Sequence, residues 1–374
     1  MDDIGALAIK REMIREQMKR YRSLPEYVLD GGTVVSRLLG SRTGFETGVP
    51  TYWINGLVIA LFTFVIGWGV SMGFDGGLDK KETPLLLWAG ATGALALVAN
   101  KVNVRLFLET FRNAPLEKIK SLKDMEDLEN WLERNFGLMK PFVSGIIFGP
   151  VLGYVLYTSW RQVSGMDFQI GPFVTITLAS IQAVWVVWYF YPFYVSFPAR
   201  ISHYHYDLYT TDPSSSEVVW QLSQLLTSIL YITITYIVYL TLGLAFFDVL
   251  SFDIASVDTA LIFSLFVWAP TVILYVTGQQ HISGLISRTK WKVLNEIQTK
   301  IETLYAEQEI PDKATVERLQ QLMDYHDRIK ATPNSALNFR ASLNFLNSLL
   351  LPVIAFVIAN GAEVVKAVNS FFRK

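Results

Sequence analysis

The sequence predicts an all-α, polytopic membrane protein, with six spans in three hairpins and a C-terminal hydrophobic helix. The first observation behind this fold class is a set of long apolar runs, each able to cross roughly 30 Å of hydrocarbon as a helix. The second is that loops rich in Lys and Arg alternate with loops that hold few basic residues. The runs lie near residues 52–73, 84–100, 141–159, 172–195, 222–247 and 257–278.

The composition agrees with a membrane protein. Of the 374 residues, 51% are hydrophobic, and the mean hydropathy is +0.32, which is high for a soluble globular protein. The chain contains no cysteine, which excludes disulfides, cysteine nucleophiles and cysteine-ligated metals. The formal net charge is −1, so the distribution of charge along the chain is more informative than its sum.

The distribution of Lys and Arg predicts the orientation in the membrane. Residues 1–50 and 101–140 are rich in Lys and Arg, whereas the loops on the opposite side contain only Lys80, Lys81 and Arg161. Basic residues are retained on the cytoplasmic side of a membrane. We therefore expect a plasma (inner) membrane protein whose N-terminus is cytoplasmic, together with segments 101–140, 196–221 and 279–342.

Two cytoplasmic helices are predicted ahead of the third run. Residues 3–22, within the N-terminal region 1–50, form a basic amphipathic pattern. This pattern fits either a helix on the anionic leaflet or a helix that packs on the protein's own cytoplasmic face. In the linker 101–140, Ser121 and Asp124 have the spacing of a capping box before a short amphipathic helix.

A cytoplasmic helical hairpin is predicted over residues 281–332, after the sixth run. Its first arm carries apolar residues at steps of three and four, and Pro311 separates it from the second arm. The expected apolar face consists of Leu294, Ile297, Ile301 and Leu304 on the first arm, and Val316, Leu319, Met323 and Ile329 on the second.

The C-terminal hydrophobic helix is predicted over residues 343–372. Its apolar part contains Pro352 and is followed by Glu363 and Lys366. Two interpretations remain open: a seventh span, or a re-entrant or interfacial helix held on the cytoplasmic side.

Small residues predict where the membrane helices pack closely. Gly145, Gly149 and Gly153 form a stripe in the third run, and Gly69 and Gly73 repeat the spacing in the first. Lipid offers little hydrophobic drive for helices to associate, so close backbone approach supplies the contact instead. We interpret these five glycines as helix-packing positions, more in intramolecular contacts than in a dedicated dimer interface.

The fifth run carries candidate pore-lining residues. Thr227, Tyr231 and Thr235 share one helix face at spacings of four residues. One interpretation is a wet surface along a pore or cavity; the other is hydrogen bonding between helices, or from each Thr back to its own helix. The centres of the runs hold essentially no ionisable residue, which disfavours an ion-coupled transporter.

One polar cluster could take part in chemistry. His203, His205 and Asp207 alternate along the loop after the fourth run, so their side chains would share a face if the chain were extended. A divalent metal needs further ligands, and no second cluster supplies them. We therefore predict no metal site, no cofactor and no catalytic residue, and favour an interfacial loop with tyrosines at the headgroups.

Three function classes follow. The first is an oligomeric channel or pore-like protein with a cytoplasmic helical element for assembly or gating. The second is a membrane-anchored scaffold or signalling protein that binds a cytoplasmic partner through the hairpin. The third, an intramembrane enzyme using His203, His205 and Asp207, is disfavoured because no catalytic motif is present. The expected partners are the lipid bilayer, further copies of the chain and a cytoplasmic protein, but no nucleic acid, and no resemblance to a named family is evident.

Overall fold

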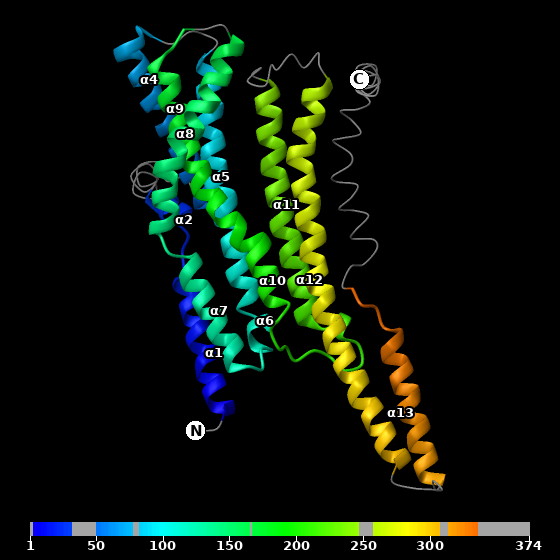
Figure 1. The fold of residues 1–374 in the computed structure, drawn as a ribbon. Coiled ribbons are helices and arrows are strands. Elements are labelled where there is room, and N and C mark those ends of the chain that lie inside the picture. Colours follow the sequence, from blue (N-terminus) through cyan, green and yellow to red (C-terminus); the bar gives the residue numbers. More distant parts are fainter. Residues whose placement is uncertain are drawn as a thin grey trace.

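The computed structural model describes residues 3–31, 50–77, 82–164, 167–246, 257–306 and 313–335, although side chains are not described for some residues near 237–272. These residues are 87% helical and contain no strand, as the all-α prediction requires (Figure 1). The main helices are α1 (Asp3–Arg20), α2 (Leu24–Gly31), α4 (Thr51–Val70), α5 (Glu82–Phe111), α6 (Ala114–Glu117), α7 (Leu122–Asn135), α8 (Met139–Ser164), α9 (Ile170–Tyr191), α10 (Phe197–Ile201), α11 (Glu217–Phe246), α12 (Val257–Ala306) and α13 (Lys313–Ala331).

Each of the six apolar runs lies mainly in one helix, namely α4, α5, α8, α9, α11 and α12; the first and fourth runs end in the π-helical turns Ser71–Asp75 and Pro192–Ser196. Among the described residues, five helical segments are long and apolar enough to cross a membrane. The sixth run lies in α12, whose side chains are described from residue 273 onward. The predicted C-terminal helix, residues 343–372, lies outside the described residues.

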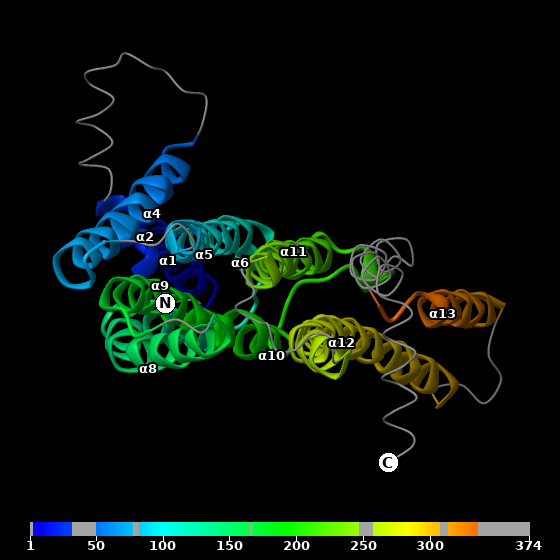
Figure 2. The ribbon, with the colours of Figure 1, turned by 90° about the horizontal axis from the view of Figure 1, so that it is seen from above.

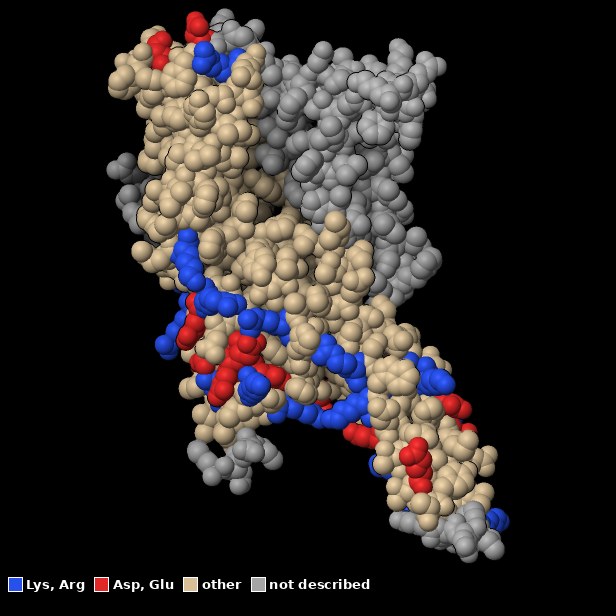
Figure 3. Space-filling view, viewed as in Figure 1, with Lys and Arg blue, Asp and Glu red and all other residues tan. Residues whose placement is uncertain are grey.

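The apolar helices form a four-helix unit and an adjoining pair. In the unit, α5 and α9 each contact α4, and α8 packs along α9; α11 then contacts α5 on one side and α12 on the other. Viewed along the helices, α11 and α12 continue the unit sideways, and α13 lies beyond them (Figure 2). Charged side chains gather at the end that carries α1, α7 and α13, which we call the charged end (Figure 3).

The largest core cluster lies where the apolar helices meet the charged end. Aromatic rings from α5, α7 and the α9–α10 junction pack there with centroid separations of 4.7–5.6 Å between Phe107 and the rings of Trp131, Phe193 and Phe197. A π-helical turn, Pro192–Ser196, links α9 to α10 and contributes Phe193 to this cluster. Burial of several aromatic side chains fixes the charged end firmly to the apolar helices.

The N-terminal helix packs on the protein itself. Ile14 and Met18 of α1 are fully buried in the same core cluster, and Lys10 forms an ion pair with Glu129 of α7. Of the two interpretations of residues 3–22, these contacts match the helix that lies against the protein's own charged end. A second short helix, α2, begins at Leu24 and contains Pro25 in its first turn.

Candidate functional site

The candidate pore-lining residues of α11 direct two of their hydroxyl groups to the helix backbone. The Thr227 hydroxyl donates to the Ser223 carbonyl at 2.8 Å, and the Thr235 hydroxyl donates to the Tyr231 carbonyl at 2.9 Å. Thr227 is half-buried and Thr235 is exposed, while Tyr231 packs against the main core cluster. This geometry matches the back-bonding alternative for the two threonines.

The glycine stripe of α8 lies against α9. A Cβ atom added to Gly145 would lie 2.0 Å from the Trp185 indole nitrogen, and one on Gly149 would lie 2.7 Å from the Ile181 Cα. A Cβ on Gly153 would lie 2.7 Å from the Thr177 Cα. Any larger residue at these positions would force the two helices apart.

The two glycines assigned to packing on the first run do not make such contacts. A Cβ on Gly69 or Gly73 would meet no described atom within 4 Å. The close approach is made instead by Gly67, whose added Cβ would lie 1.7 Å from the Thr175 hydroxyl oxygen, and by Gly171, whose added Cβ would lie 2.7 Å from the Gly67 carbonyl oxygen. Gly69 and Gly67 point to opposite sides of α4 because two residues rotate a helix by about 200°.

The His203–Asp207 loop is held by neighbours from three other segments. The His205 Nδ1 lies 3.0 Å from the Asp124 carboxylate, Asp207 forms a 2.6 Å ion pair with Lys120, and the His203 Nδ1 lies 3.3 Å from an Arg288 nitrogen. The three side chains that were considered as joint metal ligands therefore point to different partners. Lys120 lowers the pKa of the Asp207 carboxyl through its hydrogen bond.

A backbone bridge fixes this loop against the linker before α7. The Lys120 amide donates to the His205 carbonyl and the Asp207 amide donates to the Lys118 carbonyl, both at 2.8 Å. Beside the bridge, the Tyr204 hydroxyl donates to Asp127 at 2.9 Å. Burial and the neighbouring Asp127 charge raise the pKa of Tyr204, so this hydroxyl keeps its proton and remains a donor at neutral pH.

The predicted linker helix forms as α7, and its cap is confirmed. The Ser121 side chain accepts a hydrogen bond from the Asp124 amide at 3.4 Å. Met125, Leu128, Trp131 and Leu132 face the core on its buried side. Burial opposes ionisation of Asp127 on the other side, but hydrogen bonds from Arg200 and Tyr204 outweigh it and lower the pKa of that carboxyl.

The predicted hairpin is formed by the second part of α12 together with α13. We call this whole hairpin the arm (residues 279–331). Its first helix and the sixth apolar run are one continuous helix of 50 residues, α12. Leu294, Ile297 and Ile301 are buried against α13, with Leu319 and Ile329 on the opposite side of the contact. Val316 and Met323, which were expected at this contact, are instead 48% and 51% exposed.

A buried lysine fastens α13 to α12. Lys290 is 5% exposed, and its ammonium group donates to the Lys330 carbonyl at 2.8 Å, the Thr332 carbonyl at 2.7 Å and the Asn334 side-chain oxygen at 3.0 Å. All three protons of the ammonium group therefore have an acceptor. The carbonyls belong to the C-terminal end of α13, where helix carbonyls have no partner within the helix.

Sequence reasoning missed Lys290 because a lysine between Thr289 and Trp291 carries no local signal for burial. It also missed two small-residue pairs whose four-residue spacing could have indicated them. One is Gly67–Ser71, at the junction of α4 with the π-helical turn that follows it, and the other is Gly171–Thr175 on α9. Within the described residues, no group of three or more His, Cys, Asp and Glu side chains is arranged to hold a metal ion. No protein-family model, curated protein or solved structure matches this chain.

Proposed function

We propose that this chain is a membrane-anchored scaffold that binds a cytoplasmic protein through the arm. The helices are compatible with a multi-pass membrane protein by their length and composition. The observation that carries the proposal is the exposure of large apolar side chains on the arm: Trp291 is 59% exposed, Tyr305 60%, Val316 48% and Met323 51%. Exposed apolar side chains grouped on one element are typical of a protein-binding surface.

The spacing of these side chains gathers them on one side of each helix of the arm. Trp291 and Tyr305 are fourteen residues apart on α12, and Val316 and Met323 are seven apart on α13, so each pair lies on one side of its helix. At its base the arm is buried in the main core cluster through Ile282, Leu285 and Ile286. Farther along, it contacts the rest of the protein through few described side chains; one of these is Tyr325, whose hydroxyl lies 3.4 Å from the Thr210 hydroxyl. Most of its surface is therefore accessible to a partner (Figure 1).

The test is site-specific photocrosslinking in the membrane of origin, with a photoreactive residue at position 316. We expect an adduct with another chain, which Met323→Glu should abolish because it places a charge in the apolar face. Gln320→Glu adds the same charge at an exposed polar position of α13 and should leave the adduct unchanged. Loss of the adduct in both variants, or in neither, would contradict the proposal.

A channel is the second candidate, and one observation favours it. α11, which carries Thr227, Tyr231 and Thr235, packs directly against α12, so movement of the arm would reach the proposed pore-lining face through a single helix. In this case the chain assembles as a homo-oligomer and the arm contributes to assembly or gating. Neither candidate involves an enzymatic step.

The channel candidate is tested by conductance of the reconstituted protein in planar bilayers. We expect voltage- or ligand-dependent currents that change when Thr235→Val removes an exposed hydroxyl. Thr303→Val on the arm is the matched control, because its hydroxyl also bonds back to its own helix, at 2.8 Å. Silent bilayers for the unmodified protein would exclude this candidate and leave the scaffold.

A further inference from the structure

A groove opens between α8 and α9 close to the charged end. One part of it has a volume of about 480 Å³ and includes Asn135, Val187 and Tyr191 in its lining. The adjoining part has a volume of about 360 Å³ and includes Met139, Lys140 and Ile147. Ser144, Phe148 and Trp188 line both parts, so they form one continuous groove.

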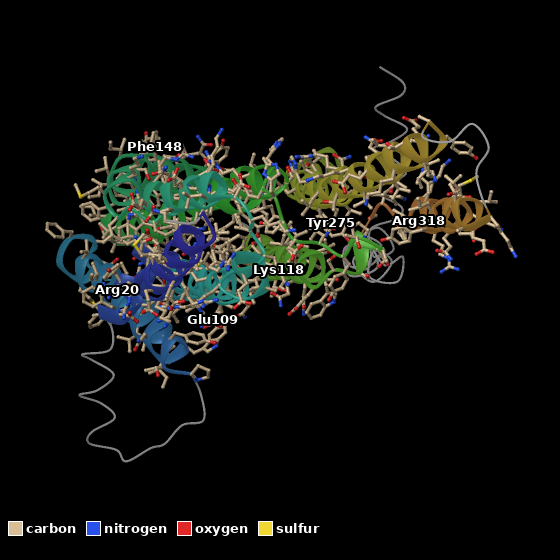
Figure 4. The ribbon with its side chains drawn as sticks, turned by 90° about the horizontal axis from the view of Figure 1, so that it is seen from below. Arg20, Glu109, Lys118, Phe148, Tyr275 and Arg318 are labelled. Carbon is tan, nitrogen blue, oxygen red and sulfur yellow. The ribbon has the colours of Figure 1, made fainter. Side chains whose placement is uncertain are left out.

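The groove is apolar along most of its length. Ile147, Phe148, Val187 and Tyr191 are 56–64% exposed, and α8 and α9 are among the helical segments that are long and apolar enough to cross a membrane. Phe148 lies at the outer edge of the α8–α9 pair, on the side away from Glu109 of α5 (Figure 4). The groove therefore faces the surroundings of the helix bundle and not its interior.

The end of the groove nearest α7 is polar and positively charged. Lys140 is exposed and forms no ion pair with any described residue, and Arg134 is exposed in the last turn of α7. The Asn135 side-chain nitrogen donates to the Trp131 carbonyl at 2.7 Å. Lys and Arg side chains of the molecule form a band just beyond its uncharged part, at the charged end (Figure 3).

We infer that this groove binds an anionic glycerophospholipid, with its phosphate beside Lys140 and one acyl chain along Ile147 and Phe148. The match rests on charge and shape together. One end of the groove holds a cation without an ion-pair partner among the described residues, and the other end is apolar. A soluble anion would satisfy only the cationic end, and an uncharged lipid only the apolar end. Moving an acyl chain out of water contributes about 0.8 kcal/mol per CH₂ group. Moving it from the surrounding lipid into the groove contributes little, because both are apolar. The preference for one lipid over another therefore comes from the headgroup.

The length of the groove agrees with a single leaflet. Lys140 and Phe148 are eight residues apart on α8, which corresponds to about 12 Å along the helix axis. One leaflet of a bilayer contributes about half of the roughly 30 Å hydrocarbon thickness. Trp188 and Tyr191 lie at the same level as Lys140, where aromatic rings are favoured at the interface with headgroups.

The inference is tested by native mass spectrometry of the full-length protein with phosphatidylglycerol and phosphatidylcholine in competition. We expect phosphatidylglycerol to be retained preferentially and Lys140→Gln to reduce that preference about fivefold, as expected for one basic residue near an anionic lipid. Lys292→Gln removes the same charge from an exposed position on the arm and should not alter the preference. Equal retention of the two lipids, or equal effects of the two variants, would overturn the inference.

A second variant separates the lipid from a protein occupant. Val187→Trp fills the groove without removing the charge of Lys140. It should therefore lower retention of both lipids while the number of chains in the assembly stays unchanged. If Val187→Trp instead dissociates an oligomer, the groove is an interface between copies and the lipid inference is wrong.

Discussion

Replacing Lys290 by Met should loosen α13 from α12 while both helices remain folded. The substitution keeps a side chain of similar length but removes the three hydrogen bonds to the Lys330 and Thr332 carbonyls and the Asn334 oxygen. A buried acceptor left without a donor costs about 1–3 kcal/mol. Water can reach part of this junction because Lys330 and Asn334 are exposed. We therefore expect a net loss equal to a single such penalty, about 1–3 kcal/mol.

Hydrogen exchange measures this loss directly. A destabilisation of about 1–3 kcal/mol corresponds to an increase of about 5- to 150-fold in the opening equilibrium of α13. The amides of residues 319–329 should therefore exchange faster by this factor, while those of α7 stay unchanged. Lys292→Met is the control, because Lys292 is exposed on the same helix. If Lys290→Met and Lys292→Met exchange alike over residues 319–329, Lys290 does not fasten α13.

Four further predictions concern other contacts. Gly149→Ala should lower the unfolding temperature in detergent, because its Cβ would lie 2.7 Å from the Ile181 backbone and overpacking costs about 1–3 kcal/mol. Gly69→Ala has open space and should be neutral or stabilising by up to about 1 kcal/mol. Leu319→Ala should destabilise the arm by about 2–5 kcal/mol, seen as protease cleavage between α12 and α13. Finally, Asp207 has a lowered pKa, so its contribution is present at neutral pH and is lost as pH falls through that folded-state value. At that pH, hydrogen exchange of the Asp207 amide should accelerate relative to the neighbouring loop amides, after correction for the intrinsic pH dependence of exchange. The Lys120→Gln variant should not show this acceleration.

Local signals predicted several elements correctly because the physics that forms them is local. Ser121 caps α7 through the amide three residues later, and the apolar runs are helical where they were expected. The same signal was overlooked at the start of α2, where Ser23 and Glu26 form a capping box. The Glu26 amide donates to the Ser23 hydroxyl, and the Ser23 amide donates to the Glu26 carboxylate. Pro25 therefore lies in a first turn, where it is tolerated, and does not end the helical region.

The choice of packing partners, which lie far away in the sequence, explains why the packing face was misassigned on α4 and on α13. Both Gly67 and Gly69 belong to small-residue patterns of α4, and only the positions of Gly171 and Thr175 on α9 decide which of them packs. The second helix of the arm presents a similar choice, because Leu319 belongs to one apolar stripe with Val316 and to another with Ile329. α12 buries the second stripe. No property of α13 alone distinguishes the two.

The loop after α10 illustrates the limits of spacing as evidence. His203, His205 and Asp207 alternate as metal ligands often do, yet the segments that approach the loop supply an Arg, an Asp and a Lys, one for each. These partners come from residues 80 or more positions away along the chain. His205 and Asp207 flank Tyr206, which bridges to Ile119, yet each of the two side chains contacts a different residue of the neighbouring segment.

The uninterrupted course of α12 makes it a lever. Its 50 residues span about 75 Å, and the portion beyond residue 278 accounts for about 42 Å of that length. If the helix pivots as a rigid rod where it leaves the apolar helices, a tilt of about 10° moves the tip of the arm by about 7 Å. A change of bilayer thickness that tilts this one helix would therefore be amplified into a displacement large enough to bring a bound protein into, or out of, reach of the membrane surface.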